Sequence, residues 1–343
     1  MSDHGAVRIS FALLLLALAC AWLLNISLGS VEIPFTSTWH ILLNGSVTDD
    51  PFNYIIWEYR VPKSITAILV GSGLALSGLL MQTLFRNPLA GPFVLGITSG
   101  ASLGAALLIM GTSFIASLGS LVYVGNVSLA IAASVGSFLV LLIVLIVAQH
   151  VRDTMALLII GLMFGSITSA LVGVLAYFSN AESLQRFVFW TYGSVGDLSL
   201  SQSLLLGGLV IAGVILSIFS IKQLNAFLLG ENYAQSLGVS LKKTRYIIII
   251  ATGLMTGAIT AFAGPIAFVG LAVPHLTRQI FNTMDHKILL PAVLIYGALL
   301  MLVCDTIAQL PNSANVLPIN AITSLIGAPV VIWLLVRKRN MLF

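Results

Sequence analysis

The sequence predicts an all-α polytopic membrane protein that crosses the bilayer ten times. Of its 343 residues, 59% are hydrophobic and only 8% are charged, whereas about a quarter of the residues are charged in an ordinary soluble domain. The stretch 87–151 contains no Asp, Glu, Lys or Arg. A soluble fold is excluded because such a chain has too little polar surface to coat a globule. Intrinsic disorder is excluded because disordered segments are poor in apolar residues and rich in charge.

Ten apolar runs each predict one membrane-spanning helix, because about 20 apolar residues cross the hydrocarbon core. Each run ends at charged residues or at Gly and Pro, and the seventh and eighth are separated only by Gly264-Pro265. An even number of spans places both termini on the same side of the membrane, and residues 1–343 form a single transmembrane domain. The predicted spans are about 9–29, 64–84, 93–112, 122–148, 155–178, 202–221, 246–262, 266–280, 288–309 and 320–336.

The distribution of basic residues predicts that both termini are cytoplasmic. In this orientation twelve of the 15 Lys and Arg residues lie on the inner side, as the positive-inside rule requires. The outer side has only Arg60, Lys63 and Arg186. The net charge of +4 therefore reflects membrane topology, and we expect the lipid bilayer rather than nucleic acid as a partner. A cleaved signal peptide ending near Cys20 is the less favoured alternative, because the first run is too long for one.

Two segments outside the spans are large enough to carry function. Residues 30–62 form an outer segment that contains several charged residues. Residues 222–245 form an inner segment that predicts a short helix, a Gly and a second short helix. The inner segment is either an interfacial anchor or a docking surface for a soluble partner, since both uses suit an amphipathic pair at the membrane surface.

Residues that would support catalysis are not arranged in any known pattern. The five His residues are scattered, the two Cys residues suggest neither a disulfide nor a metal site, and no phosphate-binding G-x-x-x-x-G-K-[ST] motif occurs. We therefore predict no enzymatic activity, no cofactor and no metal site. Asp305 is the one acidic residue within an apolar run, and a helix-packing hydrogen bond is favoured there over a proton or ion relay.

Small residues recur at every fourth position in several spans, a pattern typical of closely packed membrane helices. In the third span these are Gly96, Gly100 and Gly104, and Gly253 and Gly257 begin the same pattern in the seventh. The fifth span has an alternative use as the wall of a weakly polar transport pathway. The residues predicted to line this pathway are Gly165, Ser166, Ser169 and Gly173.

Six ordered strings across residues 57–335 closely resemble the permease family of binding-protein-dependent ABC importers for ferric siderophores, haem and cobalamin. They begin with Arg60-Val61-Pro62-Lys63 and Arg86-Asn87-Pro88-Leu89-Ala90. The others are Trp190-x-x-Gly193-Ser194, Leu229-Gly230 followed by Ala234-x-x-Leu237-Gly238, Gly264-Pro265-Ile266 through Pro274-His275, and Gly327-Ala328-Pro329.

The resemblance implies the type II ABC importer permease fold in a bacterial cytoplasmic (inner) membrane. It also implies a homodimer or a pair of similar permeases, two cytoplasmic ABC ATPase subunits and an extracytoplasmic substrate-binding protein. The expected function is import of an iron chelate, either a ferric siderophore or haem, with cobalamin as the alternative substrate. A stand-alone secondary transporter driven by an ion gradient is the competing class, and it would need no partner ATPase.

The resemblance also assigns roles to individual residues. It implies that Arg60 and Lys63 dock the binding protein, although they are also placed to anchor lipid headgroups. It assigns ATPase coupling to Leu229, Gly230, Ala234, Leu237 and Gly238, and an inner gate to Asn87, Leu89 and Thr154.

Two departures from the family pattern fall on the outer side. Many relatives carry Glu-Leu-Pro-x-Gly before the last helix, where this chain has Val316-Leu317-Pro318-Ile319-Asn320. Some relatives also carry a basic residue where this chain has Gln309. The family's detailed contacts with the binding protein are therefore not transferred to these positions.

Overall fold

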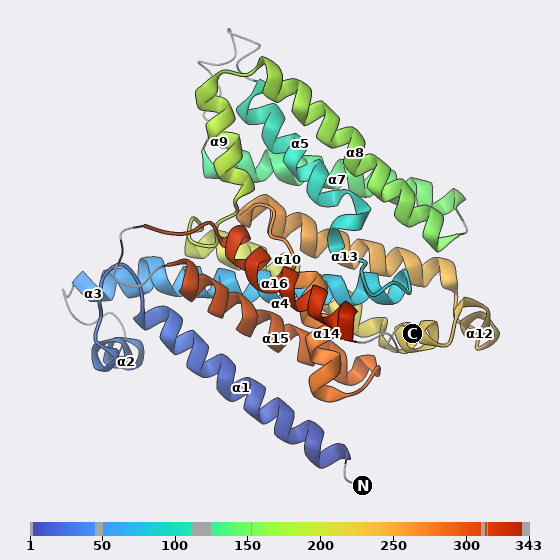
Figure 1. Cartoon of the computed structure of the whole chain (residues 1–343), viewed down its shortest axis with the longest axis horizontal. Helices are drawn as coiled ribbons and strands as arrows, with labels where there is room; N and C mark the ends of the chain where they lie inside the picture. Colours follow the sequence, from blue (N-terminus) through green and yellow to red (C-terminus); the bar gives the residue numbers. More distant parts are fainter. Residues whose placement is uncertain are drawn as a thin grey trace.

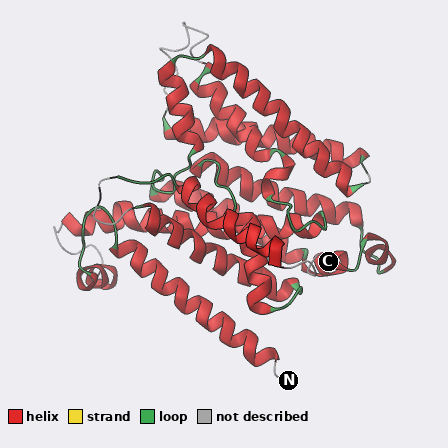
Figure 2. Cartoon of the chain, viewed as in Figure 1, coloured by secondary structure: helices red, strands yellow, loops and turns green. Residues whose placement is uncertain are grey.

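The computed structural model describes residues 3–44, 51–111, 125–151, 153–309, 313 and 315–337. Within these ranges every regular element is a helix, as Figure 2 shows. The prediction of an all-α protein is confirmed.

Each of the ten predicted runs overlaps one helix of the structure. Their bounds are α1 (Asp3–Ser27), α4 (Val61–Leu84), α5 (Ile97–Ile109), α7 (Asn126–His150), α8 (Thr154–Phe178), α10 (Leu200–Phe219), α13 (Leu241–Ala263), α14 (Val269–Phe281), α15 (His286–Ala308) and α16 (Ile319–Arg337). Among the described residues, seven helical stretches are long and apolar enough to cross a membrane, whereas α5, α14 and α16 are shorter. The chain is thus multi-pass, and the count of ten and the orientation stay predictions.

Short helices mark the two ends of the molecule. One end carries α2 (Phe35–Asn44), α3 (Pro51–Tyr54) and the π-helical turn η1 (Ile55–Arg60). We call it the α2 end. The opposite end carries α11 (Ile221–Leu228) and α12 (Glu231–Ser236), and we call it the α12 end. Figure 1 shows that α1 begins and α16 finishes toward the α12 end, an arrangement that an even number of crossings produces.

Three predicted boundaries change in the structure. The third run begins as a 3-10 turn (η2, Pro92–Leu95), and α5 starts only after Gly96, whose φ of +72° interrupts the helix. The second run begins earlier than expected, because the chain is helical from Pro51 onward; part of the predicted outer segment therefore continues into a span. The last residues of the predicted inner segment belong to α13, which starts at Leu241.

The helices form two groups that α13 connects. Figure 1 shows α5, α7, α8 and α9 (Ala181–Thr191) on one side and α1, α4, α14, α15 and α16 on the other. Helix α13 packs against both α4 and α7, and α10 packs against α13 and α4.

Glycines allow the closest helix crossings, as expected for membrane helices, where small residues let backbones approach. A Cβ atom on Gly78 of α4 would lie 1.6 Å from the carbonyl oxygen of Gly270 in α14. A Cβ atom on Gly104 of α5 would lie 2.1 Å from the carbonyl oxygen of Ala132 in α7. These contacts support the packing interpretation of the small-residue stripe in the third span.

Candidate functional sites

The predicted coupling segment folds as a helix, a glycine and a second helix at the α12 end. Gly230 separates α11 from α12 with φ +102°, and Gly238 follows α12 with φ +83°. Both values lie in a region that favours glycine. The two glycines therefore allow the chain to reverse around α12.

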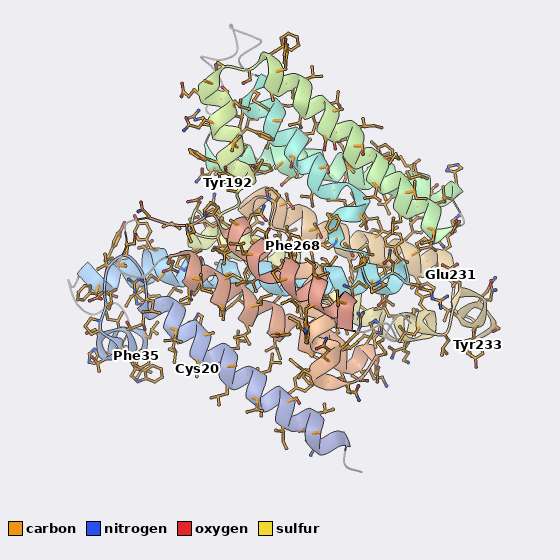
Figure 3. All side chains as sticks on the ribbon, viewed as in Figure 1. Cys20, Phe35, Tyr192, Glu231, Tyr233 and Phe268 are labelled. Carbon is orange, nitrogen blue, oxygen red and sulfur yellow. The ribbon has the colours of Figure 1, made fainter. Side chains whose placement is uncertain are left out.

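An exposed apolar row lies on this segment. Leu229, Tyr233 and Leu237 are 61%, 55% and 58% exposed, and they follow one another at four-residue intervals. We call these three residues the apolar row. Figure 3 labels Tyr233 and Glu231 on α12, which projects from the molecule. Ala234 was expected on the same contact surface, but it is fully buried and packs in the protein core.

Glu231 connects α12 to the start of α8 and to α13. The hydroxyl of Thr154 donates a hydrogen bond to Glu231 Oε1 at 2.5 Å, and Arg245 Nη2 donates to Thr154 Oγ1 at 2.9 Å. Arg245 also forms an ion pair with Glu231 at 3.5 Å and donates to the carbonyl oxygen of Val151 at 3.1 Å. We call Thr154, Glu231 and Arg245 the α12 triad. It links the predicted gate residue Thr154 directly to the coupling segment.

A cavity of about 910 Å³ lies between these elements at the α12 end. The end of α4, the start of α8 and the coupling segment form its wall, and its polar lining includes Arg86, Asp153, Thr154 and Glu231. One predicted gate residue, Thr154, and two predicted coupling residues, Leu229 and Gly230, thus border one open space.

The other two predicted gate residues lie in the turn after α4. The backbone N–H of Leu89 donates to Asn87 Oδ1 at 2.9 Å, and the Leu89 side chain is exposed. A ring nitrogen of His275 lies 2.7 Å from the carbonyl oxygen of Pro88. His275 of α14 is thus tied to the turn after α4.

A second polar cluster ties α11 to α4 and α15. Asn225 Nδ2 donates to Asp285 Oδ1 at 2.6 Å, and Asn225 Oδ1 lies 2.7 Å from His286 Nδ1. The other ring nitrogen of His286 lies 2.9 Å from the hydroxyl of Thr83. The backbone N–H of Lys287 donates to Asp285, which lowers the pKa of this carboxyl group. The coupling segment is thereby joined to two core helices.

The predicted pathway residues lie on the exposed side of α8. Ser166, Ser169 and Gly173 are exposed and Gly165 is half-buried. One turn before them, Gly161 packs against the backbone of Val94 in η2. The small residues of α8 thus divide between a packed start and an exposed remainder, and the pathway role stays a prediction.

At the α2 end, Arg60 is bonded inside its own chain. Its Nη1 donates to the carbonyl oxygens of Ile26 and Ser27, both at 2.6 Å, and its Nη2 donates to the carbonyl oxygen of Val31. The residue is only 8% exposed. It stabilises the end of α1 and the following turn, where carbonyl groups lack helical donors. This burial differs from the exposed cation expected for docking.

Lys63 also has an intramolecular partner. Its Nζ lies 3.1 Å from Asp305 Oδ1, and Asp305 Oδ2 accepts hydrogen bonds from Asn25 and Gln309, each at 2.8 Å. Asp305 thus joins α1, α4 and α15, as its helix-packing interpretation predicted. Lys63 keeps 20% of its side chain exposed and lines a cavity of about 590 Å³.

Both departures from the family pattern have structural partners here. Gln309 donates a hydrogen bond to Asp305 Oδ2, as described above. Asn320, near the start of α16, accepts a hydrogen bond from the backbone N–H of Ala267 at 3.0 Å. Val316 is exposed and lines the same cavity as Lys63.

Sequence reasoning missed Glu231, Arg245 and Asn225 as connecting residues. None of them is a matching residue of a motif, and their partners lie 14 to 94 positions away along the chain. The only available signal was charge within the short inner segment. Among the described residues, no group of three or more His, Cys, Asp and Glu side chains is arranged to hold a metal ion.

The fold and these sites define a multi-pass helical membrane protein whose α12 end carries an exposed apolar row. The chain belongs to the FecCD transport family, whose model matches residues 15–337. Members of this family are permease subunits of ABC transporters, which are not themselves enzymes.

Curated relatives give the same assignment. The hemin transport system permease protein HmuU of Yersinia pestis is 34% identical over 99% of both chains. The vitamin B12 import system permease protein BtuC of Klebsiella pneumoniae is 40% identical over 83% of both chains. BtuC of Salmonella typhi is 37% identical over 82% of this chain and 84% of its own.

A solved structure described as an inward-facing conformation of a metal-chelate type ABC transporter is 30% identical, with a TM-score of 0.82. It covers 96% of this chain and 99% of its own. The chain is therefore an ABC importer permease of the FecCD and BtuC type.

Proposed function

We propose that this permease imports an iron chelate of the haem or ferric siderophore class across a bacterial inner membrane. The observation that carries the proposal is the match to a hemin permease along 99% of both chains. The similarity to a metal-chelate type transporter over 96% of this chain gives independent support.

Cobalamin is the second candidate substrate. The vitamin B12 permease of Klebsiella pneumoniae has the higher identity, 40%, although its match covers 83% of this chain rather than nearly all of it. Both candidates are bulky metal complexes, so both suit a pathway between two permease subunits.

In the proposed complex, two permease subunits pair with two ATPase subunits at the α12 end, which is then cytoplasmic. The apolar row would enter a groove of the ATPase, because an exposed amphipathic helix binds through its apolar face. The α12 triad would pass motion of α12 to Thr154 at the start of α8. The turn containing Asn87 and Leu89 would close the transport pathway at the α12 end.

A substrate-binding protein would dock at the α2 end, around the cavity that Lys63 and Val316 line. Lys63 retains enough exposure to meet an acidic partner. Arg60 would act indirectly, by holding the turn after α1. Exposed ion pairs are worth only about 0–1 kcal/mol, so Lys63 would orient the binding protein rather than hold it.

Uptake by the reconstituted complex tests the substrate. The chain, its ATPase and its binding protein are placed in proteoliposomes and supplied with ATP and one labelled compound: haem, a hydroxamate ferric chelate, a catecholate ferric chelate or cobalamin. We expect ATP-dependent, vanadate-sensitive accumulation of one iron chelate. The control is an ATPase variant that binds but does not hydrolyse ATP. Accumulation of cobalamin alone would replace the first candidate by the second.

A further inference from the structure

Helix α2 carries an exposed apolar stripe on one side. Phe35, Trp39 and Leu43 are 53%, 48% and 66% exposed, and their four-residue spacing places them on the same side of the helix. The opposite side packs into the protein, where Thr38 is buried and Ile41 belongs to a small core cluster that also contains Ile26, Ile33, Ile56 and Val61. The apolar stripe therefore points away from this cluster.

A polar edge borders the stripe. Thr36 and His40 are exposed, and at about 100° per residue both lie to one side of Phe35, Trp39 and Leu43. The sequence of α2 contains no Asp, Glu, Lys or Arg. Helix α2 thus has one side toward the protein, one apolar side and one polar edge. This pattern is typical of a helix that lies in a membrane interface.

The apolar stripe continues the exposed apolar surface of α1. Ile9, Leu13, Leu16 and Leu24 of α1 are exposed at helical spacing, and so is Leu28 directly after the helix. From Ile9 to the end of α1 the helix extends about 30 Å, which is the thickness of the hydrocarbon core. Leu28 thus lies near the core boundary, and α2 begins seven residues later.

The direction of α2 also suits a helix that lies at the boundary of the hydrocarbon core. Figure 1 shows α2 almost end-on and α1 from the side, so α2 runs across the spanning helices rather than along them. Figure 3 labels Cys20, which belongs to the exposed side of α1, and Phe35 at neighbouring positions on one edge of the molecule.

We propose that α2 is an interfacial anchor whose Phe35, Trp39 and Leu43 side chains lie at the headgroup–acyl boundary of the leaflet at the α2 end. The occupant of this face is phospholipid. Since α2 has no charged residue, contact depends on the apolar boundary and not on anionic headgroups. The anchor fixes the connection between α1 and η1, and it does not rest on the transported substrate.

Fluorescence of Trp39 in lipid nanodiscs tests the anchor. The chain has five Trp residues, so the Trp39 signal is the difference between the unmodified chain and Trp39→Phe. With lipids brominated at a shallow acyl position we expect this component to lose at least half of its emission, as an interfacial indole should. Aqueous iodide should quench it weakly, and the result should be the same in neutral and anionic lipid.

Two further variants separate anchoring from misfolding. Leu43→Asp should weaken the bromolipid quenching of Trp39, whereas Thr36→Asp, on the polar edge, should leave it unchanged. The two variants are compared only as monodisperse samples, so that misfolded protein does not contribute to the fluorescence. The proposal is overturned if iodide quenches Trp39 as strongly as a free indole while bromolipid does not. It is also overturned if Trp39 becomes shielded only after the substrate-binding protein is added, which would make this face a protein contact.

Discussion

Each end of the molecule carries a sequence motif of the FecCD family, and the two motifs direct their side chains in opposite ways. At the α2 end the basic motif turns its side chains inward, where Arg60 binds three backbone carbonyl groups and Lys63 pairs with Asp305. At the α12 end the coupling motif turns Leu229 and Leu237 outward, away from the core. The first end is stabilised by its own polar network, whereas the second leaves an apolar surface for another molecule.

A motif shared with a family does not say whether its residues serve the fold or a partner. Burial decides between the two. Removing an inward residue should cost stability, because buried polar groups lose their partners. Removing an outward residue should cost association and leave stability nearly unchanged.

The largest expected effect is on stability, from Arg60→Met. This substitution leaves three backbone carbonyl groups near the end of α1 without their donor, and each buried group left unpaired costs about 1–3 kcal/mol. We expect a loss of about 3 kcal/mol or more, measured as a lower unfolding temperature in detergent. The control is Arg186→Met on exposed α9, which should change little. Equal stability of the two variants would contradict the structural role of Arg60.

A smaller loss of stability is expected from Lys63→Met. Breaking a buried ion pair typically costs 3–5 kcal/mol, but Lys63 is 20% exposed, so we expect about 1–2 kcal/mol. The double variant Lys63→Met/Asp305→Asn should recover part of it, since it leaves no unpaired charge and keeps a side-chain oxygen that can accept from Asn25 and Gln309. The unfolding temperatures of the three proteins give the answer. No recovery in the double variant would mean that the pair does not act as a unit.

Glu231→Gln should change stability little and affect coupling more. The Glu231 side chain is 34% exposed, so its ion pair with Arg245 contributes at most about 1 kcal/mol. The substitution removes the carboxylate that Thr154 and Arg245 share. We expect slower ATP-dependent uptake with normal ATPase binding, compared in proteoliposomes with Glu182→Gln on α9. Unchanged uptake would show that the α12 triad transmits nothing.

The smallest effect on stability is expected from Leu237→Ala, within about ±0.5 kcal/mol, because the side chain is exposed. The expected result is reduced co-purification of the ATPase subunit. The matched control is Leu204→Ala, an equally exposed leucine of the spanning helix α10. If both variants retain the ATPase equally, the apolar row is not the contact.

Much of the fold could be predicted from the sequence. Apolar runs of membrane length predicted the helical class, and the glycine of the inner segment, Gly230, predicted the break between α11 and α12. The start of α5 was misplaced because Pro92 to Leu95 is as apolar as a span, yet Gly96 turns the chain. Composition detects hydrophobicity and does not detect a local change of backbone direction.

The candidate sites were predicted less completely. The sequence identified Thr154 but not its partners Glu231 and Arg245, which come from different helices. It placed Arg60 and Lys63 on the outer side but not in contact with α1 and α15. It also included Ala234 in the coupling surface, although this residue faces the core.

The amino-acid sequence was sufficient to identify a helical membrane protein, because transfer of apolar residues into lipid depends mainly on local composition. Which charged groups are neutralised within the chain, and which side chains remain exposed, became visible only in the folded protein. That choice depends on contacts between residues far apart in sequence, such as Lys63 with Asp305. Local patterns carry no information about such distances.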